Sequence, residues 1–293
     1  MERTGYNKIS RIRLTGFLGF IDYDMDLADP VTIITAPNGF GKSTIFYMTR
    51  FLLDPSGTAF ERIKDIPFKD FRCDLSNGMA VELRREDVSD AQRPNFVYII
   101  YNKNGSVRHK INSKEYGDLI LWCIGHKEKE FLEESGCMVK INYRPPSHTF
   151  YENYKMSNGT QYAWEDDRWE SSESPIQFDL FARIFNERNG CTGKTVKVSP
   201  DGIELHSKLG QITFNTLSAG EAHDFALFYN LVFNAYNGVV LIDEPERSMH
   251  ISLQKSFIDR VMEICMINDL QVIIATHSPE IVNRYRDHVR GPK

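Results

Sequence analysis

The chain has 293 residues, of which 41% are hydrophobic and 26% charged, with a formal net charge of −5. This length and composition are typical of a globular protein with a large core in one or two domains. The acidic balance argues against a protein dedicated to nucleic acid, which needs a concentrated basic face. The five cysteines are widely spaced and form no C-x-x-C pair, which argues against zinc and for a reducing compartment. No apolar run could span a bilayer and no signal segment is recognisable, so we expect a cytoplasmic protein.

The N-terminal residues predict strands. Ile9–Leu14 and Phe17–Met25 alternate apolar and polar side chains around Gly16, which indicates two strands or a hairpin. The apolar run Val31–Thr35 follows, and we expect all three segments to form one opening sheet. Three aromatic residues could pack near a nucleotide base, although a place in the core or on the sheet surface is the favoured interpretation: Tyr6, Phe17 and Phe20.

The next stretch, Ala36–Thr44, has the spacing of a phosphate-binding loop and lies between a strand and a helical pattern. Its glycines let successive backbone N–H groups face one anion, and the positive end of the following helix adds to the attraction. Lys42 is expected to reach the β- and γ-phosphates, and the Ser43 hydroxyl to bind Mg²⁺. Ala36 replaces the usual first glycine, and a glycine-rich surface turn is the alternative for the motif alone. The predicted nucleotide-binding residues here are Asn38, Gly39, Phe40, Gly41, Lys42, Ser43 and Thr44.

The middle of the chain is rich in strand patterns. Residues Asp54–Ser76 show little regularity. Strands are then predicted at Met79–Arg85, Phe96–Tyr101, Ser106–Ile111 and Met138–Tyr143, and a short helix at Lys127–Glu134. We interpret residues 77–175 as an inserted β-rich and irregular region rather than an independent domain. Its last part, Arg144–Pro175, is aromatic and acidic, and either binds a partner or pins a loop onto the domain.

A helix is predicted to begin at Ser174-Pro175 and to stop at Gly190, followed by strands at Thr195–Val198 and Ile203–His206. No heptad pattern occurs between the phosphate-binding loop and residue 217. The sequence therefore predicts no long coiled coil.

The segment Leu217–Glu221 opens an amphipathic helix. Ser218 as N-cap and Glu221 three residues later form a capping box, which alone predicts only a well-capped helix. The same helix end is also an anion site. If it lies on the opposite side of the domain from the phosphate-binding loop, it can serve ATP held by another copy. The residues of this second site are Ser218, Ala219, Gly220 and Glu221.

The run Gly238–Glu244 is an apolar strand that ends in two acids. Such a strand suits the centre of a parallel sheet, where it delivers ligand-binding groups at its carboxyl end. We expect Asp243 to hold the Mg²⁺ shell and Glu244 to orient the attacking water. The alternative is a strand that ends in solvated acids.

The C-terminal part repeats this arrangement. Pro245–His250 leads into a helix, and Gln271–His277 is a second buried strand that ends in a histidine. A lone histidine is more often structural, but at this strand end His277 is placed to hydrogen-bond a γ-phosphate.

In this order, the motifs resemble those of the ABC-type ATPase superfamily. The matches are Walker A (Ala36–Thr44), the signature (Leu217–Glu221), Walker B (Val239–Glu244), the D-loop (Glu246–His250) and the switch histidine (Thr276–His277). The resemblance implies an α/β P-loop NTPase with a mixed or parallel central sheet flanked by helices, an inserted β-rich subdomain and no coiled coil. The glutamine of the Q-loop has no convincing candidate among Gln92, Gln161 and Gln177.

The resemblance further implies one ATPase domain over residues 1–293. Residues 1–55 would form the N-terminal sheet with Walker A, and residues 176–293 the lobe with the other motifs. It implies ATP and Mg²⁺ as ligands, Glu244 and His277 as catalytic residues, and Ser43 and Asp243 as metal ligands. Two copies would sandwich ATP in a homodimer, and dimers could assemble further.

Within the superfamily, the two sequence segments IDEPERSMH and ATHSPEI resemble those of a compact soluble branch. That branch includes OLD-type ATPases and the ATPases of the Septu, PARIS and retron-associated anti-phage systems. This implies a separate effector that ATP controls, such as a nuclease, since no TOPRIM or HNH-like constellation is present. The alternatives are an ATP-sensing scaffold with little turnover, a DNA-repair or SMC-like ATPase, and a transporter subunit. Direct contact with nucleic acid stays open.

Overall fold

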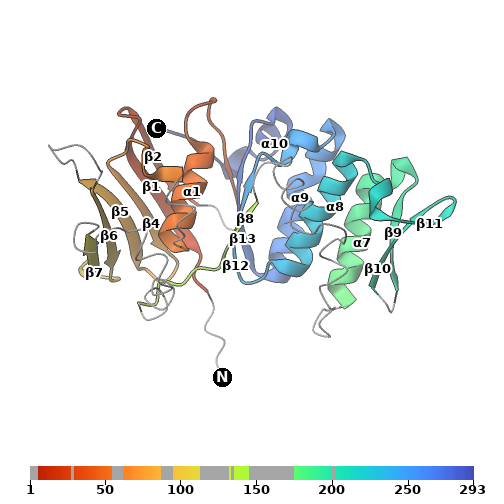
Figure 1. The fold of residues 1–293 in the computed structure, drawn as a ribbon, viewed down its shortest axis with the longest axis horizontal. Coiled ribbons are helices and arrows are strands. Elements are labelled where there is room, and N and C mark those ends of the chain that lie inside the picture. Colours follow the sequence, from red (N-terminus) through yellow and green to blue (C-terminus); the bar gives the residue numbers. More distant parts are fainter. Residues whose placement is uncertain are drawn as a thin grey trace, which may run out of the picture.

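The structure is a computed structural model. It describes residues 6–27, 30–54, 62–86, 95–112, 132, 135–144, 175–199 and 202–293. In Figure 1 an antiparallel sheet, helix α1 (Lys42–Leu53), a parallel sheet, a group of helices and a small outer sheet follow one another along the long axis of the molecule. Helix α1 therefore lies between two sheets.

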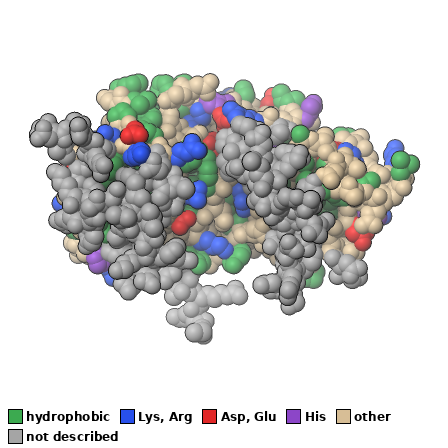
Figure 2. Space-filling model, in the orientation of Figure 1, with side chains coloured by type: hydrophobic (Ala, Val, Ile, Leu, Met, Phe, Trp, Pro, Cys, Tyr) green, Lys and Arg blue, Asp and Glu red, His purple; other side chains and the backbone are tan. Residues whose placement is uncertain are grey.

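The antiparallel sheet has six strands in the order β2-β1-β4-β5-β6-β7. Their bounds are β1 Ile9–Phe17, β2 Ile21–Asp26, β4 Asp70–Leu75, β5 Ala80–Glu86, β6 Asn95–Tyr101 and β7 Val107–Asn112. One face packs on α1 through side chains such as Leu14, Phe71 and Leu83, which are fully buried. The polar side chains of the same strands form ion pairs, such as Arg13 with Asp74. Basic and acidic side chains are likewise interspersed where Figure 2 draws the described residues.

The second sheet has five parallel strands in the order β14-β3-β13-β12-β8. Their bounds are β3 Val31–Ile34, β8 Ile141–Arg144, β12 Gly238–Asp243, β13 Leu270–Ala275 and β14 Val289–Arg290. Every residue of β12 and β13 is buried. Side chains of β12 alternate between two cores, with Leu241 in the core around α1 and Ile242 in the core of the helical side.

The helical side covers the other face of the parallel sheet (Figure 1). It contains α7 (Pro175–Asn189), α8 (Ala219–Tyr229), which continues into a π-helical turn over Asn230–Asn234, α9 (Ile251–Asn268) and α10 (Pro279–Arg284). The small outer sheet has the order β11-β10-β9, with β9 Thr195–Ser199, β10 Gly202–Ser207 and β11 Gly210–Ile212. Arg188 of α7 forms a buried two-bond ion pair with Asp224 of α8, at 2.6 and 2.7 Å. This pair fixes α8 against α7.

The structure confirms the fold class and most predicted elements, with three corrections. The expected opening sheet is wrong, because Val31–Ile34 joins the parallel sheet while Ile9–Phe17 and Ile21–Asp26 join the antiparallel one. Residues 54–76 are more regular than predicted, since they contain β4. The strand predicted at Met138–Tyr143 is β8, and it joins the parallel sheet beside β12.

Strands β5 to β7 complete the sheet that β1, β2 and β4 begin, so the N-terminal hairpin and these middle strands share one layer. Most of the predicted helix at 127–134, and nearly all of the aromatic and acidic stretch over 144–175, lie outside the described residues. Of the helices in the described ranges, none is long and apolar enough for a membrane span.

Candidate functional site

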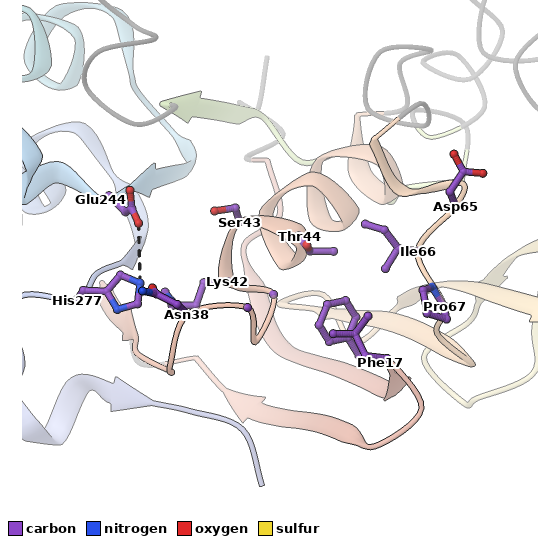
Figure 3. A pocket seen from close by; sticks show the side chains of 13 residues that line it. Phe17, Asn38, Lys42, Ser43, Thr44, Asp65, Ile66, Pro67, Glu244 and His277 are labelled. Atoms are coloured by element: carbon purple, nitrogen blue, oxygen red, sulfur yellow. Dashed lines mark ion pairs between the residues drawn. The ribbon is translucent and has the colours of Figure 1, made fainter.

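A cavity of about 470 Å³ lies beside the N-terminus of α1, where strands β3, β12 and β13 end. It is lined by Phe17, Leu18, Asn38, Gly39, Gly41, Lys42, Ser43, Thr44, Asp65, Ile66, Pro67, Glu244 and His277. Figure 3 shows its two ends, with Glu244 and His277 on one side of the loop before α1 and Phe17, Ile66 and Pro67 on the other. The cavity therefore has a charged end and a mainly apolar end, which also includes the Asp65 side chain.

The loop between β3 and α1 has the geometry of an anion cradle. Gly39 and Gly41 have φ angles of 84° and 85°, in the left-handed region that favours glycine. Gly41 is the N-cap of α1 and makes no side-chain capping bond, so no N-cap side chain occupies the N–H groups of the first turn. The Tyr23 hydroxyl donates to the Phe40 carbonyl at 2.8 Å and ties the loop to β2. The free backbone N–H groups of the loop and of the first turn of α1 can hold a phosphate chain.

The Phe17 ring packs against the phosphate-binding loop at Gly41. A Cβ atom on Gly41 would lie 2.5 Å from the Phe17 ring. The backbone and the ring are therefore so close that only glycine fits at this position. Phe17 is 3% exposed and belongs to the core around α1. The fit of Gly41 on Phe17 therefore joins the end of β1 to the phosphate-binding loop.

Lys42 is buried at the centre of the cavity wall. Its Nζ donates to the Ala36 carbonyl at 3.0 Å and to the Pro37 carbonyl at 3.4 Å, so it closes the loop on itself. Burial lowers the pKa of Lys42, and the negative charges of Glu244 and Asp243 oppose that shift. A phosphate group would supply the negative charge that this buried ammonium lacks.

Asp243 ends β12 and is 1% exposed. Its Oδ2 accepts a hydrogen bond from the Tyr143 hydroxyl at 3.4 Å, while Oδ1 is buried without a hydrogen-bond partner. Burial raises the pKa of Asp243, and a hydrogen bond from the Ser43 hydroxyl opposes the rise. An orphaned carboxylate oxygen beside a serine hydroxyl fits Mg²⁺, which prefers one or two such oxygens together with phosphates and waters.

Glu244 follows directly and takes a left-handed backbone conformation, with φ 48°, that is uncommon for a residue other than glycine. Its carboxylate lies 3.8 Å from His277 Nε2, which the dashed line in Figure 3 marks, and 2.6 Å from Arg247 Nε. The backbone N–H of His277 donates to Glu246 Oε1 at 2.7 Å. The ends of β12 and β13 thus present an acid and a histidine to one point of the cavity.

The second predicted anion site lies elsewhere. Ser218 and Glu221 form the expected capping box, and Lys194 Nζ lies 2.7 Å from Glu221 Oε2. Burial favours a higher pKa for Glu221, but the bonds from Lys194 and Ser218 outweigh it and lower the pKa to about 2. In Figure 1, α8 and α1 lie on opposite sides of the parallel sheet, and residues 218–221 do not line the cavity.

The structure thus brings most predicted site residues together. Within the cavity wall are Asn38, Gly39, Gly41, Lys42, Ser43, Thr44, Glu244 and His277. Phe40 is an exception, because it is only partly buried and packs against the core around α1. Phe17 lines the cavity, whereas Phe20 is 73% exposed and Tyr6 36% exposed. Gln177 bonds to the Val232 carbonyl on the helical side and is no Q-loop residue; Gln92 and Gln161 lie outside the described residues.

Four features of the site were missed from the sequence. Leu18, Ile66 and Pro67 line the mainly apolar end together with Asp65, and a bond from Leu18 N to the Pro67 carbonyl at 2.9 Å holds the two segments together. Arg247 contacts Glu244, and the Tyr143 hydroxyl contacts Asp243. Residues 65–67 and Tyr143 lie in stretches without a motif. Only Arg247, three residues after Glu244, could have been suspected from its spacing.

This fold and this site define a P-loop ATPase domain. A family model described as "AAA domain" matches residues 11–187, more than half of the chain, and the chain belongs to this family. A second model, described as "AAA domain, putative AbiEii toxin, Type IV TA system", matches residues 153–283. No curated protein matches the sequence.

Solved structures that are similar to this chain include two SMC head domains. The SMC head domain from Thermotoga maritima is 14% identical with a TM-score of 0.50, and the match covers 97% of this chain and 94% of that chain. A structure of an SMC head bound to the C-terminal winged-helix domain of ScpA is 14% identical with a TM-score of 0.49, and covers 97% and 96% of the two chains. At this identity the first similarity shows the fold alone. With the family, it makes the chain an ATPase with an SMC-head-like fold.

Proposed function

We propose that two copies of this chain close head to tail around Mg²⁺-ATP, hydrolyse it, and thereby gate a separate effector in bacterial anti-phage defence. The single observation that supports the proposed dimer is the separation of the two anion sites within one chain. The phosphate-binding loop lines the cavity, while Ser218–Glu221 begins a helix on the other side of the parallel sheet. One chain cannot use both ends on one nucleotide, but two chains can.

Each residue then has a task in this scheme. The backbone N–H groups of Gly39 to Thr44 and the Lys42 ammonium bind the phosphates. Ser43 and Asp243 would hold Mg²⁺, which would neutralise charge on the phosphate oxygens when bound. The partner's helix end at Ser218 caps the γ-phosphate. The base would lie at the apolar end of the cavity, against side chains such as Phe17, Leu18 and Ile66.

Hydrolysis needs an oriented water molecule. Glu244 is placed to accept a hydrogen bond from that water, and His277 to donate one to the γ-phosphate. The cavity places both side chains beside Lys42, at its charged end. The proposed enzyme is cytoplasmic, and residues 1–293 act as one ATPase unit in which residues 1–55, 77–175 and 176–293 are successive parts.

The link to defence has two supports. The amino-acid sequence from Ile242 to His250 resembles that of the compact ATPases of anti-phage systems. The second matching family is described by a toxin of a type IV toxin–antitoxin system, which suits an ATPase that controls a toxic effector. A nuclease is the effector we propose, recruited as a separate chain.

The test uses Glu244→Gln in the full chain. With saturating Mg²⁺-ATP, this variant should hydrolyse slowly and run as a stable dimer in size-exclusion chromatography with light scattering. Adding Ser218→Arg should return it to a monomer while leaving binding of a fluorescent ATP analogue intact, because Ser218 caps the nucleotide of the partner only. A Glu244→Gln variant that stays monomeric with saturating Mg²⁺-ATP and turns over normally would exclude the scheme.

A second candidate is an ATP-sensing scaffold with little turnover. The contact of Arg247 with Glu244 favours it, since a carboxylate held by a guanidinium is less available to water. Phosphate release measured with and without a co-purified partner distinguishes the two. A rate that stays near zero in both cases favours the scaffold. An SMC-like role in DNA repair shares the fold, and a salt-sensitive DNA shift in a gel would support it.

A further inference from the structure

Strand β8 brings a residue to the site that no motif marks. It pairs with β12 in parallel, and Tyr143 lies opposite Leu241. Side chains that alternate along β12 place Leu241 in the core around α1, so its neighbour Tyr143 also faces α1. Its ring contacts Phe46 and Tyr47 edge-on, with centroids 6.3 and 5.5 Å apart. The end of β8, like those of β3, β12 and β13, therefore lies near the site, and it places Tyr143 beside the end of the Walker B strand β12.

Of the two carboxylate oxygens of Asp243, the Tyr143 hydroxyl bonds to Oδ2. It lies 3.4 Å from Oδ2, across 100 positions of sequence. Oδ1 of the same carboxylate is buried and has no hydrogen-bond partner. A buried carboxylate oxygen without a donor is costly unless a ligand completes it. The two oxygens of Asp243 thus have different surroundings, and Tyr143 is one source of that difference.

We propose that Tyr143 is a positioning residue, whose hydroxyl holds Oδ2 of Asp243 so that Oδ1 stays available for the Mg²⁺ of Mg²⁺-ATP. The inference rests on the proposed role of Asp243 in holding magnesium. A carboxylate that is fixed in one rotamer before the metal arrives loses less side-chain freedom on binding. The ring contacts with Phe46 and Tyr47 fix the hydroxyl in turn, because α1 carries both rings and also begins with the phosphate-binding loop.

The test is the magnesium dependence of nucleotide binding by the full chain, with a fluorescent ATP analogue as the probe and Tyr143→Phe as the variant. Phenylalanine keeps the ring contacts and removes only the hydroxyl. We expect the Mg²⁺ concentration for half-maximal binding to rise about two- to tenfold, the size that loss of one hydrogen bond produces. Binding of the analogue without Mg²⁺ should stay close to that of the wild type.

Tyr98→Phe is the matched control. Tyr98 is also buried, and its hydroxyl donates to the Leu52 carbonyl at the opposite end of α1. Its loss should lower stability without changing the Mg²⁺ dependence. Equal Mg²⁺ dependence in Tyr143→Phe and the wild type, or equal shifts in the two tyrosine variants, would overturn the proposal.

Asp243→Asn separates this inference from the proposed function. If Asp243→Asn raises the Mg²⁺ requirement and Tyr143→Phe does not, the role of Tyr143 is refuted while the magnesium role of Asp243 stands. If Asp243→Asn has no effect, both are refuted. If both variants shift the requirement, with the larger shift for Asp243→Asn, the proposal is supported.

Discussion

The Arg247 guanidinium contacts the Glu244 carboxylate, with Arg247 Nε 2.6 Å from Glu244 Oε2. Glu244 is the N-cap of the 3₁₀ turn Pro245–Ser248 that follows β12, and Arg247 lies within that turn, three positions after Glu244. His277 lies 3.8 Å from the other oxygen of the same carboxylate. In the single chain, the acid proposed to orient water is therefore already held by a cation.

We predict that Arg247→Ala raises the basal ATPase rate of the isolated chain by about two- to fivefold. The Arg247 side chain is 50% exposed, and an ion pair of that exposure is worth about 0.5–1 kcal/mol, which sets the size of the effect. Steady-state phosphate release at saturating Mg²⁺-ATP measures it.

Two further variants interpret this result. Arg247→Lys keeps the charge but loses the planar guanidinium, and should fall between the wild type and Arg247→Ala. Arg247→Ala combined with Glu244→Gln should show no increase, since the released carboxylate is gone. A lower rate in Arg247→Ala than in the wild type would instead mean that Arg247 supports turnover.

The contact between Gly41 and Phe17 gives a second prediction. Gly41→Ala should lower the free energy of unfolding by about 2–5 kcal/mol, because it combines a left-handed backbone with a Cβ atom 2.5 Å from the Phe17 ring. Gly39→Ala is the matched control. It has nearly the same φ, 84°, but nothing within 4 Å of its Cβ, so only the backbone cost of about 1–2 kcal/mol applies.

Urea unfolding of both variants measures the difference. Phe17→Leu added to Gly41→Ala should recover part of the loss, because the smaller side chain leaves room for the Cβ atom. Equal destabilisation by Gly39→Ala and Gly41→Ala would show that the contact with Phe17 is not tight in solution.

Local chemistry made much of this molecule predictable from its sequence. The phosphate-binding loop was found because glycines at fixed spacing before Lys42 serve a backbone need. The strand at Gly238–Asp243 was found because a sheet covered on both faces requires a continuous apolar run. The capping box of Ser218 and Glu221 depends only on residues three apart, and the structure confirms it.

Long-range pairing could not be predicted in the same way. Strand β3 follows β2 closely in sequence, yet it does not pair with the N-terminal hairpin. It pairs with β13, where Val31 lies opposite Val272, 241 positions further along the chain. Tyr143 reaches Asp243 because β8 crosses to the parallel sheet, and nothing in the pattern of Ile141–Arg144 names that partner. A four-residue strand carries too little periodicity to specify its sheet.

The capping box gives the last prediction, which concerns pH. Bonds from Lys194 and Ser218 lower the pKa of Glu221 to about 2 from its ordinary value of 4.5, against the effect of burial. A carboxyl group whose pKa is lower in the folded state stabilises the fold above its unfolded pKa, and this contribution is lost as the pH falls through the folded pKa. Glu221→Gln should therefore cost about 1 kcal/mol at pH 7, after allowance for solvent screening at the protein surface. The cost should shrink as the pH falls from about 4.5 towards 2.

Glu280→Gln, which removes a carboxylate from the first turn of α10, is the control and should change stability less. Chemical unfolding of the three proteins across this pH range measures the effect, and a cost of Glu221→Gln that is constant down to pH 2 would contradict it.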